Sequence, residues 1–206
     1  MGPPPAGTVR AMRPLDLDLG PCEGLLHEHD PDRCVVVLPG KRYSTQAPLL
    51  WFAREVAEEQ GFSVLEVLDA LPGDMEPLDW ARDRARRALD ATQADDVVVV
   101  GKSLASAAAG IVADRQRPAV WLTPLLDQPA VLDGLARAAR PALLVGGTAD
   151  PTWLPEALPP SPMLEHVDLD GLDHSLQRPG DPVASLDALR TVTERVARFL
   201  HAQAVG

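Results

Sequence analysis

Residues 97–105 constrain the fold of this chain more than any other stretch. Four consecutive valines at 97–100 follow two aspartates, and such a run of β-branched apolar side chains is typical of a strand buried on both faces of a sheet. Gly101 ends the run, and the alanine-rich residues 104–113 have the composition of a helix that packs closely on a sheet. The stretch therefore predicts a strand, a sharp turn at Ser103 and a helix.

The same alternation of apolar runs and helical periodicity extends along the chain. Further strands are expected at 34–38, 64–68, 119–123, 141–145 and 164–169, with weaker candidates at 9–13 and 24–27. Helices are expected at about 49–60, 76–92, 129–139 and 181–204, and Pro72-Gly73 is expected to form a turn. The pattern predicts the α/β class, as a single-domain, doubly wound, mostly parallel sheet flanked by helices. This domain would span 9–206, after a flexible N-terminal tail at 1–8.

The composition of the chain argues against some classes of binding partner and indicates a cellular compartment. The chain has 206 residues, enough for one domain, and its net charge of −11 argues against nucleic acid or an anionic membrane surface as the main partner. Cys22 and Cys34 are too few for a disulfide framework and lack zinc-ligand spacing, so we interpret them as free thiols in a reducing compartment. No signal peptide and no membrane-spanning stretch is recognisable. We expect a cytoplasmic monomer or homodimer.

The turn after the valines has the pattern of a nucleophile elbow. Gly101-Lys102-Ser103-Leu104-Ala105 is one residue away from Gly-x-Ser-x-Gly, in which a strained turn lifts the serine hydroxyl above the edge of the sheet. The extra methyl of Ala105 could tighten this turn. Gly-Lys-Ser also ends a phosphate-binding loop, but that motif needs a glycine where Asp96 stands. An incidental serine in a strand-to-helix turn remains the plain alternative.

An acid and a histidine follow later strands in a telling order. In a parallel sheet, ligands collect at the carboxyl ends of the strands. Asp150 follows the strand at 141–145, and His174 follows the strand at 164–169. Serine, then acid, then histidine is the chain order of the triad in α/β-hydrolases. Two other acids, Asp173 and Asp127, are alternatives to Asp150, and His166 lies within its strand and is interpreted as structural.

With these motifs in this order, the chain resembles a small, lidless member of the α/β-hydrolase superfamily of serine esterases, thioesterases and dienelactone-hydrolase-like proteins. The resemblance covers about 33–204. It implies Ser103 as the nucleophile, His174 as the general base and then acid, and Asp150 as the group that orients and supports the imidazolium. The chain departs from the family at Ala105 and at Pro39, where many relatives have histidine.

The resemblance also implies where an oxyanion and a substrate would bind. Leu104 N–H, at the start of the helix, is the natural first oxyanion donor, and the loop at 39–43 would supply the second from Lys41 or its neighbour Arg42. Lys41 and Arg42 are either a solvated turn or a preference for substrates that carry a carboxylate or phosphate. A possible substrate pocket comprises Arg42, Tyr43, Trp121, Pro124, Leu125 and Trp153, although large apolar residues are more often core.

No cofactor and no metal is expected. His27-Glu28-His29-Asp30 places two histidines on one face of a strand, but no third ligand is identifiable. We therefore expect a serine hydrolase that cleaves a small-molecule ester or thioester through an acyl-enzyme on Ser103. The alternatives are a non-catalytic binding or scaffold protein with the same fold, and an acyltransferase that uses the same triad.

Overall fold

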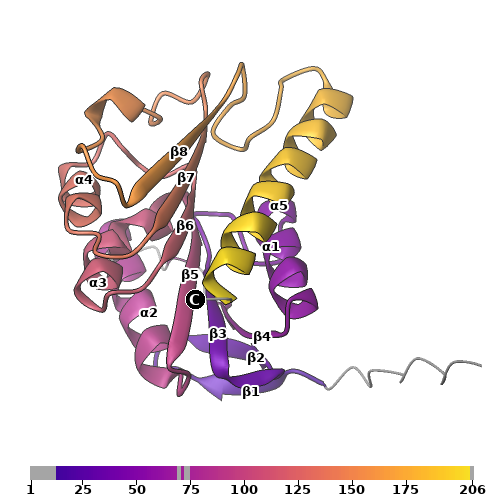
Figure 1. The fold of residues 1–206 in the computed structure, drawn as a ribbon, viewed down its shortest axis with the longest axis vertical. Helices are drawn as coiled ribbons and strands as arrows, with labels where there is room; N and C mark the ends of the chain where they lie inside the picture. The colour runs from indigo at the N-terminus through magenta and orange to yellow at the C-terminus, as the bar shows by residue number, and fades with distance from the viewer. Residues whose placement is uncertain (1–12, 69–70, 72–74, 205–206) are drawn as a thin grey trace, which may run out of the picture.

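An eight-stranded sheet forms the centre of the protein in a computed structural model that describes residues 13–68, 71 and 75–204 (Figure 1). The strand order is β1-β2-β4-β3-β5-β6-β7-β8; β3 to β8 run parallel, whereas β1 and β2 are antiparallel at one edge. The strands are β1 Leu15–Asp18, β2 Glu23–His27, β3 Asp30–Leu38, β4 Phe62–Val67, β5 Asp96–Lys102, β6 Ala119–Leu122, β7 Ala142–Gly147 and β8 Leu164–Leu169.

Helices cover both faces of this sheet. Figure 1 shows α1 (Pro48–Glu59) and α5 (Pro182–Ala204) on one face, and α2 (Pro77–Ala91), α3 (Ala109–Asp114) and α4 (Pro129–Ala136) on the other. This arrangement confirms the predicted doubly wound, mostly parallel fold. Between β6 and β7 the chain forms α4 and its connections, and no lid domain is inserted there. None of the helices in the described part of the chain is long and apolar enough to cross a membrane.

The valines of β5 are buried on both sides, as predicted. Val97 and Val99 pack into the core under α2, α3 and α4, whereas Val98 and Val100 pack into the core under α1 and α5. Each of the four is at most 2% exposed. Because β5 lies between β3 and β6 in the middle of the sheet, the turn that follows it stands at the centre of the carboxyl edge.

The local differences from the sequence prediction lie at the edge strands and after β5. The weak strand at 24–27 corresponds to β2, but β1 was not predicted, because its alternation of leucine and aspartate over four residues is too short a signal. The expected helix at 104–113 begins as a 3-10 helix, η1 (Ser103–Ala108), before α3. Its small side chains tolerate the eclipsed spacing of that tighter helix. The tail at 1–8, residues 9–12 of the other weak strand and the turn at 72–73 lie outside the described residues.

Candidate active site

Ser103 occupies a strained turn at the end of β5. Its φ of 52° lies in the left-handed region, which a residue other than glycine seldom adopts and which clusters at functional sites. A Cβ added at Gly101 would lie 2.7 Å from the ring of Trp121 and 2.9 Å from Cβ of Ala105. Gly101 therefore permits the close approach, and the methyl of Ala105 fits because position 101 has no side chain. Ser103 itself is 8% exposed.

His174 connects Ser103 to Asp150. The imidazole Nε2 lies 2.7 Å from Ser103 Oγ, and Nδ1 lies 2.7 Å from Asp150 Oδ2. The side chain of His174 is 37% exposed, whereas that of Asp150 is fully buried. A short hydrogen bond on each side of one imidazole is the arrangement by which a histidine can accept a proton from a serine while a carboxylate supports the charge.

Asp150 is fixed by its own neighbours in the loop after β7. Its Oδ1 accepts hydrogen bonds from the backbone N–H and the hydroxyl of Thr152, both at 2.9 Å. Burial alone would raise the pKa of the Asp150 carboxyl, but the hydrogen bonds from His174 and Thr152 outweigh burial and hold this pKa below its usual range. Asp150 therefore remains a carboxylate at neutral pH and can hold the imidazole in one orientation.

The two alternative acids lie elsewhere. Asp173 Oδ1 accepts the backbone N–H groups of Ser175 at 2.8 Å and Gln177 at 3.0 Å, so its carboxylate organises its own loop. Asp127 is exposed after β6. Of the three candidates, Asp150 is the acid that is hydrogen-bonded to the His174 imidazole.

The loop after β3 lies directly beside Ser103. A Cβ added at Gly40 would lie 3.5 Å from Cβ of Ser103. Gly40 and Tyr43 exchange two backbone hydrogen bonds of 2.9 and 3.2 Å, which places Lys41 and Arg42 at the exposed tip, with Arg42 at φ 57°. Since the N–H groups of Gly40 and Tyr43 are used in this turn, those of Lys41 and Arg42 are the candidates in this loop for a second oxyanion donor.

The expected pocket residues do not all line an open space. Trp121 and Trp153 are 1% and 5% exposed and belong to the core on the side of α2, α3 and α4. Trp153 also donates from Nε1 to Asp168 Oδ1 at 2.8 Å. Pro124 is buried and Leu125 half-buried. Both tryptophans are therefore part of the core and do not face an open space beside Ser103.

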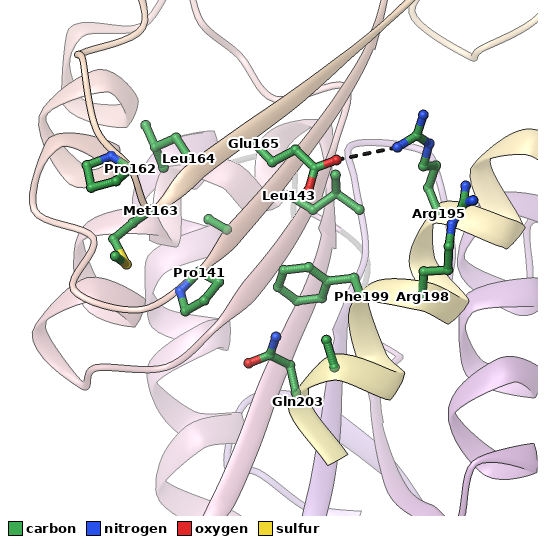
Figure 2. Close-up of a pocket in the computed structure, with 12 residues that line it drawn as sticks. Pro141, Leu143, Pro162, Met163, Leu164, Glu165, Arg195, Arg198, Phe199 and Gln203 are labelled. Carbon is green, nitrogen blue, oxygen red and sulfur yellow. Dashed lines mark hydrogen bonds and ion pairs between the residues drawn. The ribbon is translucent and has the colours of Figure 1, made fainter. Parts of the chain in front are cut away.

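Among the described residues, one cavity beside α5 lies far from the candidate site, and another adjoins the loop that carries His174. Figure 2 shows a cavity of about 430 Å³ between α5 and the first residues of β7 and β8, bordered by the Glu165–Arg195 ion pair. It lies at the amino ends of those strands, about 20 Å from their carboxyl ends at 3.3 Å per residue. A second cavity, of about 490 Å³, adjoins the loop of His174 and is lined by Tyr43, Leu49, Ser175, Leu176, Leu186 and Leu189, among others.

Lys102 is a residue of this site that sequence reasoning missed. It is 2% exposed, and its Nζ donates to Thr123 Oγ1 and to the backbone carbonyl oxygen of His174, both at 3.0 Å. Nζ also lies 4.8 Å from the centre of the Tyr43 ring. Burial lowers the pKa of the Lys102 ammonium to about 8, although Asp150 opposes the change. The available signal was a lysine at the end of a strand predicted to be buried.

The two histidines of His27-x-His29 lie next to carboxylates. His27 Nε2 lies 2.9 Å from Glu66 Oε1, and His27 Nδ1 lies 3.0 Å from Glu58 Oε1. Arg54 Nη1 also contacts Glu66 Oε1 at 3.0 Å. Across residues 13–68, 71 and 75–204 no group of three or more His, Cys, Asp or Glu side chains is arranged to hold a metal. His27 and Arg54 therefore both contact the buried carboxylate of Glu66, whereas His29 approaches only Glu58, at 3.9 Å.

No protein-family model and no curated protein matches this sequence. Solved structures do match. Est1E from Butyrivibrio proteoclasticus has a TM-score of 0.74 at 14% identity, over 95% of this chain and 100% of that chain. Dienelactone hydrolase from Anabaena variabilis has a TM-score of 0.70 at 20% identity, over 93% and 99%. An alpha-beta serine hydrolase homologue from Coxiella burnetii has a TM-score of 0.67 at 13% identity, over 93% and 99%.

These likenesses extend over nearly the whole length of each chain, at low sequence identity. They show that this chain has the α/β-hydrolase fold, which confirms the fold expected from the order of its motifs.

Proposed function

We propose that this chain, which has the α/β-hydrolase fold, is a serine hydrolase that cleaves a small carboxylic ester or thioester through an acyl-enzyme on Ser103. The observation that carries the proposal is the continuous pair of hydrogen bonds from Asp150 through His174 to Ser103, each 2.7 Å long. Three residues distant in sequence meet at one edge of the sheet in the geometry that nucleophilic catalysis requires. The strained φ of Ser103 supports the same conclusion.

The chemistry follows from these contacts. Ser103 Oγ attacks the acyl carbon while its proton passes to His174 Nε2, and Asp150 stabilises the resulting imidazolium through Nδ1. The tetrahedral oxyanion accepts hydrogen bonds from Leu104 N–H and from the N–H of Lys41 or Arg42. His174 then gives the proton to the leaving alkoxide or thiolate. Water, deprotonated by the same imidazole, hydrolyses the acyl-enzyme and restores Ser103.

The surroundings favour a short or soluble acyl group. In the described part of the chain no lid domain is inserted between β6 and β7 to cover a long lipid chain, and the cavity beside the His174 loop, lined by Tyr43 and Leu176, has room for a small apolar group. We expect p-nitrophenyl acetate and butyrate to be hydrolysed faster than the palmitate ester. Much faster turnover of the palmitate ester would contradict this part of the proposal.

Labelling with a fluorophosphonate tests the proposal, because this probe forms a stable adduct only with an activated serine. We expect a single adduct by intact mass spectrometry, lost in Ser103→Ala and strongly slowed in His174→Ala. His166→Ala is a matched control, since its side chain is exposed and lies outside the hydrogen-bonded set. No adduct on folded protein would instead favour a non-catalytic binding protein.

The alternative function for the same triad is transfer of the acyl group to an acceptor other than water. It predicts that added alcohols or thiols appear in the product as new esters or thioesters. If free acid remains the product at high acceptor concentration, hydrolysis is the reaction.

A further inference from the structure

A buried ammonium joins three strand ends directly beneath the candidate site. Lys102 is the last residue of β5; its Nζ reaches Thr123, which follows β6, and the backbone of His174, which follows β8. Lys102 is also the neighbour in sequence of Ser103. One residue therefore connects the main chain that carries the serine to the main chain that carries the histidine.

Burying the Lys102 ammonium lowers the stability of the fold, which argues that this lysine has a functional role. An ammonium removed from water is unfavourable unless its partners compensate, and an apolar side chain of similar volume would fill the same space without that cost. Burial lowers the pKa of Lys102 to about 8 even though the carboxylates of Asp150 and Asp173 favour the charged form. The partner Thr123 has φ 47°, a strained conformation for a β-branched residue. Two residues with strained backbone, Ser103 and Thr123, therefore both lie next to the Lys102 ammonium or its backbone.

We propose that Lys102 is a positioning residue: by donating to the carbonyl oxygen of His174 it holds the loop of that histidine, and so fixes the imidazole against Ser103. The inference rests on the proposed function of Ser103 and His174. The Asp173 carboxylate organises the residues after His174, but Asp150 and Ser103 contact only the His174 ring, and Lys102 contacts its main chain. A displacement of about 1 Å at a reacting group can slow a reaction by about 100-fold.

The strength of this contact depends on the charge of Lys102. Five groups face the ammonium: the carboxylates of Asp150 and Asp173, the ring of Tyr43, the hydroxyl of Thr123, and His174 through its carbonyl oxygen. Below about pH 8 the charged ammonium makes charge-assisted hydrogen bonds, and above that pH the neutral amine makes weaker ones. The rate of reaction at Ser103 should therefore fall above about pH 8.

The test is Lys102→Met, which keeps the length and apolar volume of the side chain and removes the donor. The probes are a fluorophosphonate, for the rate constant of Ser103 labelling, and p-nitrophenyl acetate, for turnover. We expect labelling and kcat to fall by about 10- to 100-fold, with KM within about 2-fold because the buried Lys102 does not touch substrate. The fall in rate above about pH 8 should disappear, and Lys102→Arg should label faster than Lys102→Met.

Arg54→Met is the matched control, because it removes another buried cation, one that pairs with Glu66 on β4. Its labelling rate per folded molecule should equal that of the original protein. If the original protein labels on Ser103 and Lys102→Met labels at the same rate, the positioning role is overturned while the hydrolase proposal stands. If the original protein does not label, the hydrolase proposal itself fails. If Lys102→Met does not fold, a labelling rate of the original protein that is level from about pH 7 to pH 10 overturns the positioning role.

Discussion

Lys102 should give the stability of this protein a characteristic dependence on pH. The pKa of a lysine in the unfolded chain is near 10.5, and burial lowers it to about 8 in the folded protein. Between these pH values the unfolded chain holds a proton that the folded chain has lost. The free energy of unfolding therefore rises with pH, by about 1.4 kcal/mol for each pH unit. Below about pH 8 both states hold the proton, and the full cost of the buried charge is present.

The difference between the original protein and Lys102→Met isolates this effect. Effects of the substitution that do not involve the protonation of Lys102, such as altered packing, change the stability of the variant by an amount that is constant with pH. Burial also raises the pKa of the Tyr43 hydroxyl and the Cys34 thiol, but both groups are present in both proteins and cancel in the difference. From about pH 7 to pH 10, the stability of Lys102→Met relative to the original protein should therefore fall by about 2–3 kcal/mol.

Urea unfolding at several pH values between about pH 7 and pH 10, on both proteins, measures this difference. Linear extrapolation gives each free energy, and equal slopes against urea would show that the two unfolded states are comparable. A stability difference that stays constant over this range would refute the reasoning, because it would mean that Lys102 has the same pKa in the folded and unfolded states. Arg54→Met, whose guanidinium does not titrate in this range, should show a constant difference.

Three other substitutions test the site. Asp150→Asn keeps the shape but removes the charge that supports the His174 imidazolium, so the labelling rate of Ser103 should fall by about 10²- to 10⁴-fold. Because the pKa of Asp150 is below its usual range, the Asp150 carboxylate stabilises the fold above about pH 4, and this stabilisation is lost as pH falls further. Urea unfolding of Asp150→Asn at several pH values should not show that loss. Gly101→Ala places a methyl 2.7 Å from the Trp121 ring and should cost about 1–3 kcal/mol of unfolding free energy, against about 1 kcal/mol for the control Gly180→Ala, which meets no atom within 4 Å. Ala105→Gly should cost about 1 kcal/mol and change labelling by less than about 3-fold, because position 101 already makes room for the methyl; a large gain in rate would show that Ala105 does tighten the turn.

The central strands and the main helices could be predicted because their signals are local. The four valines of β5 have no polar side to present to water, so only a strand covered on both faces can accommodate them. The order of Ser103, Asp150 and His174 after three parallel strands likewise depends on topology alone, since the carboxyl ends of such strands lie at one edge. Short edge strands such as β1 carry little apolar signal in the sequence, and they form because they pair with a neighbouring strand.

The details of the site depend on contacts between residues far apart in sequence, which no local pattern contains. As large apolar residues near strand ends, Trp121 and Trp153 are plausible pocket residues from the sequence. In the structure, Gly101 and Gly146 have no side chains where the two rings pack, so both rings fit into the core. A lysine is usually a surface residue, but Lys102 is buried, and the carbonyl oxygen that it binds belongs to a residue 72 positions later. A charged residue at the end of a buried strand has to find such a partner or leave the core, so a lysine directly before an expected nucleophile is itself a reason to look for a buried acceptor in the loop of the base.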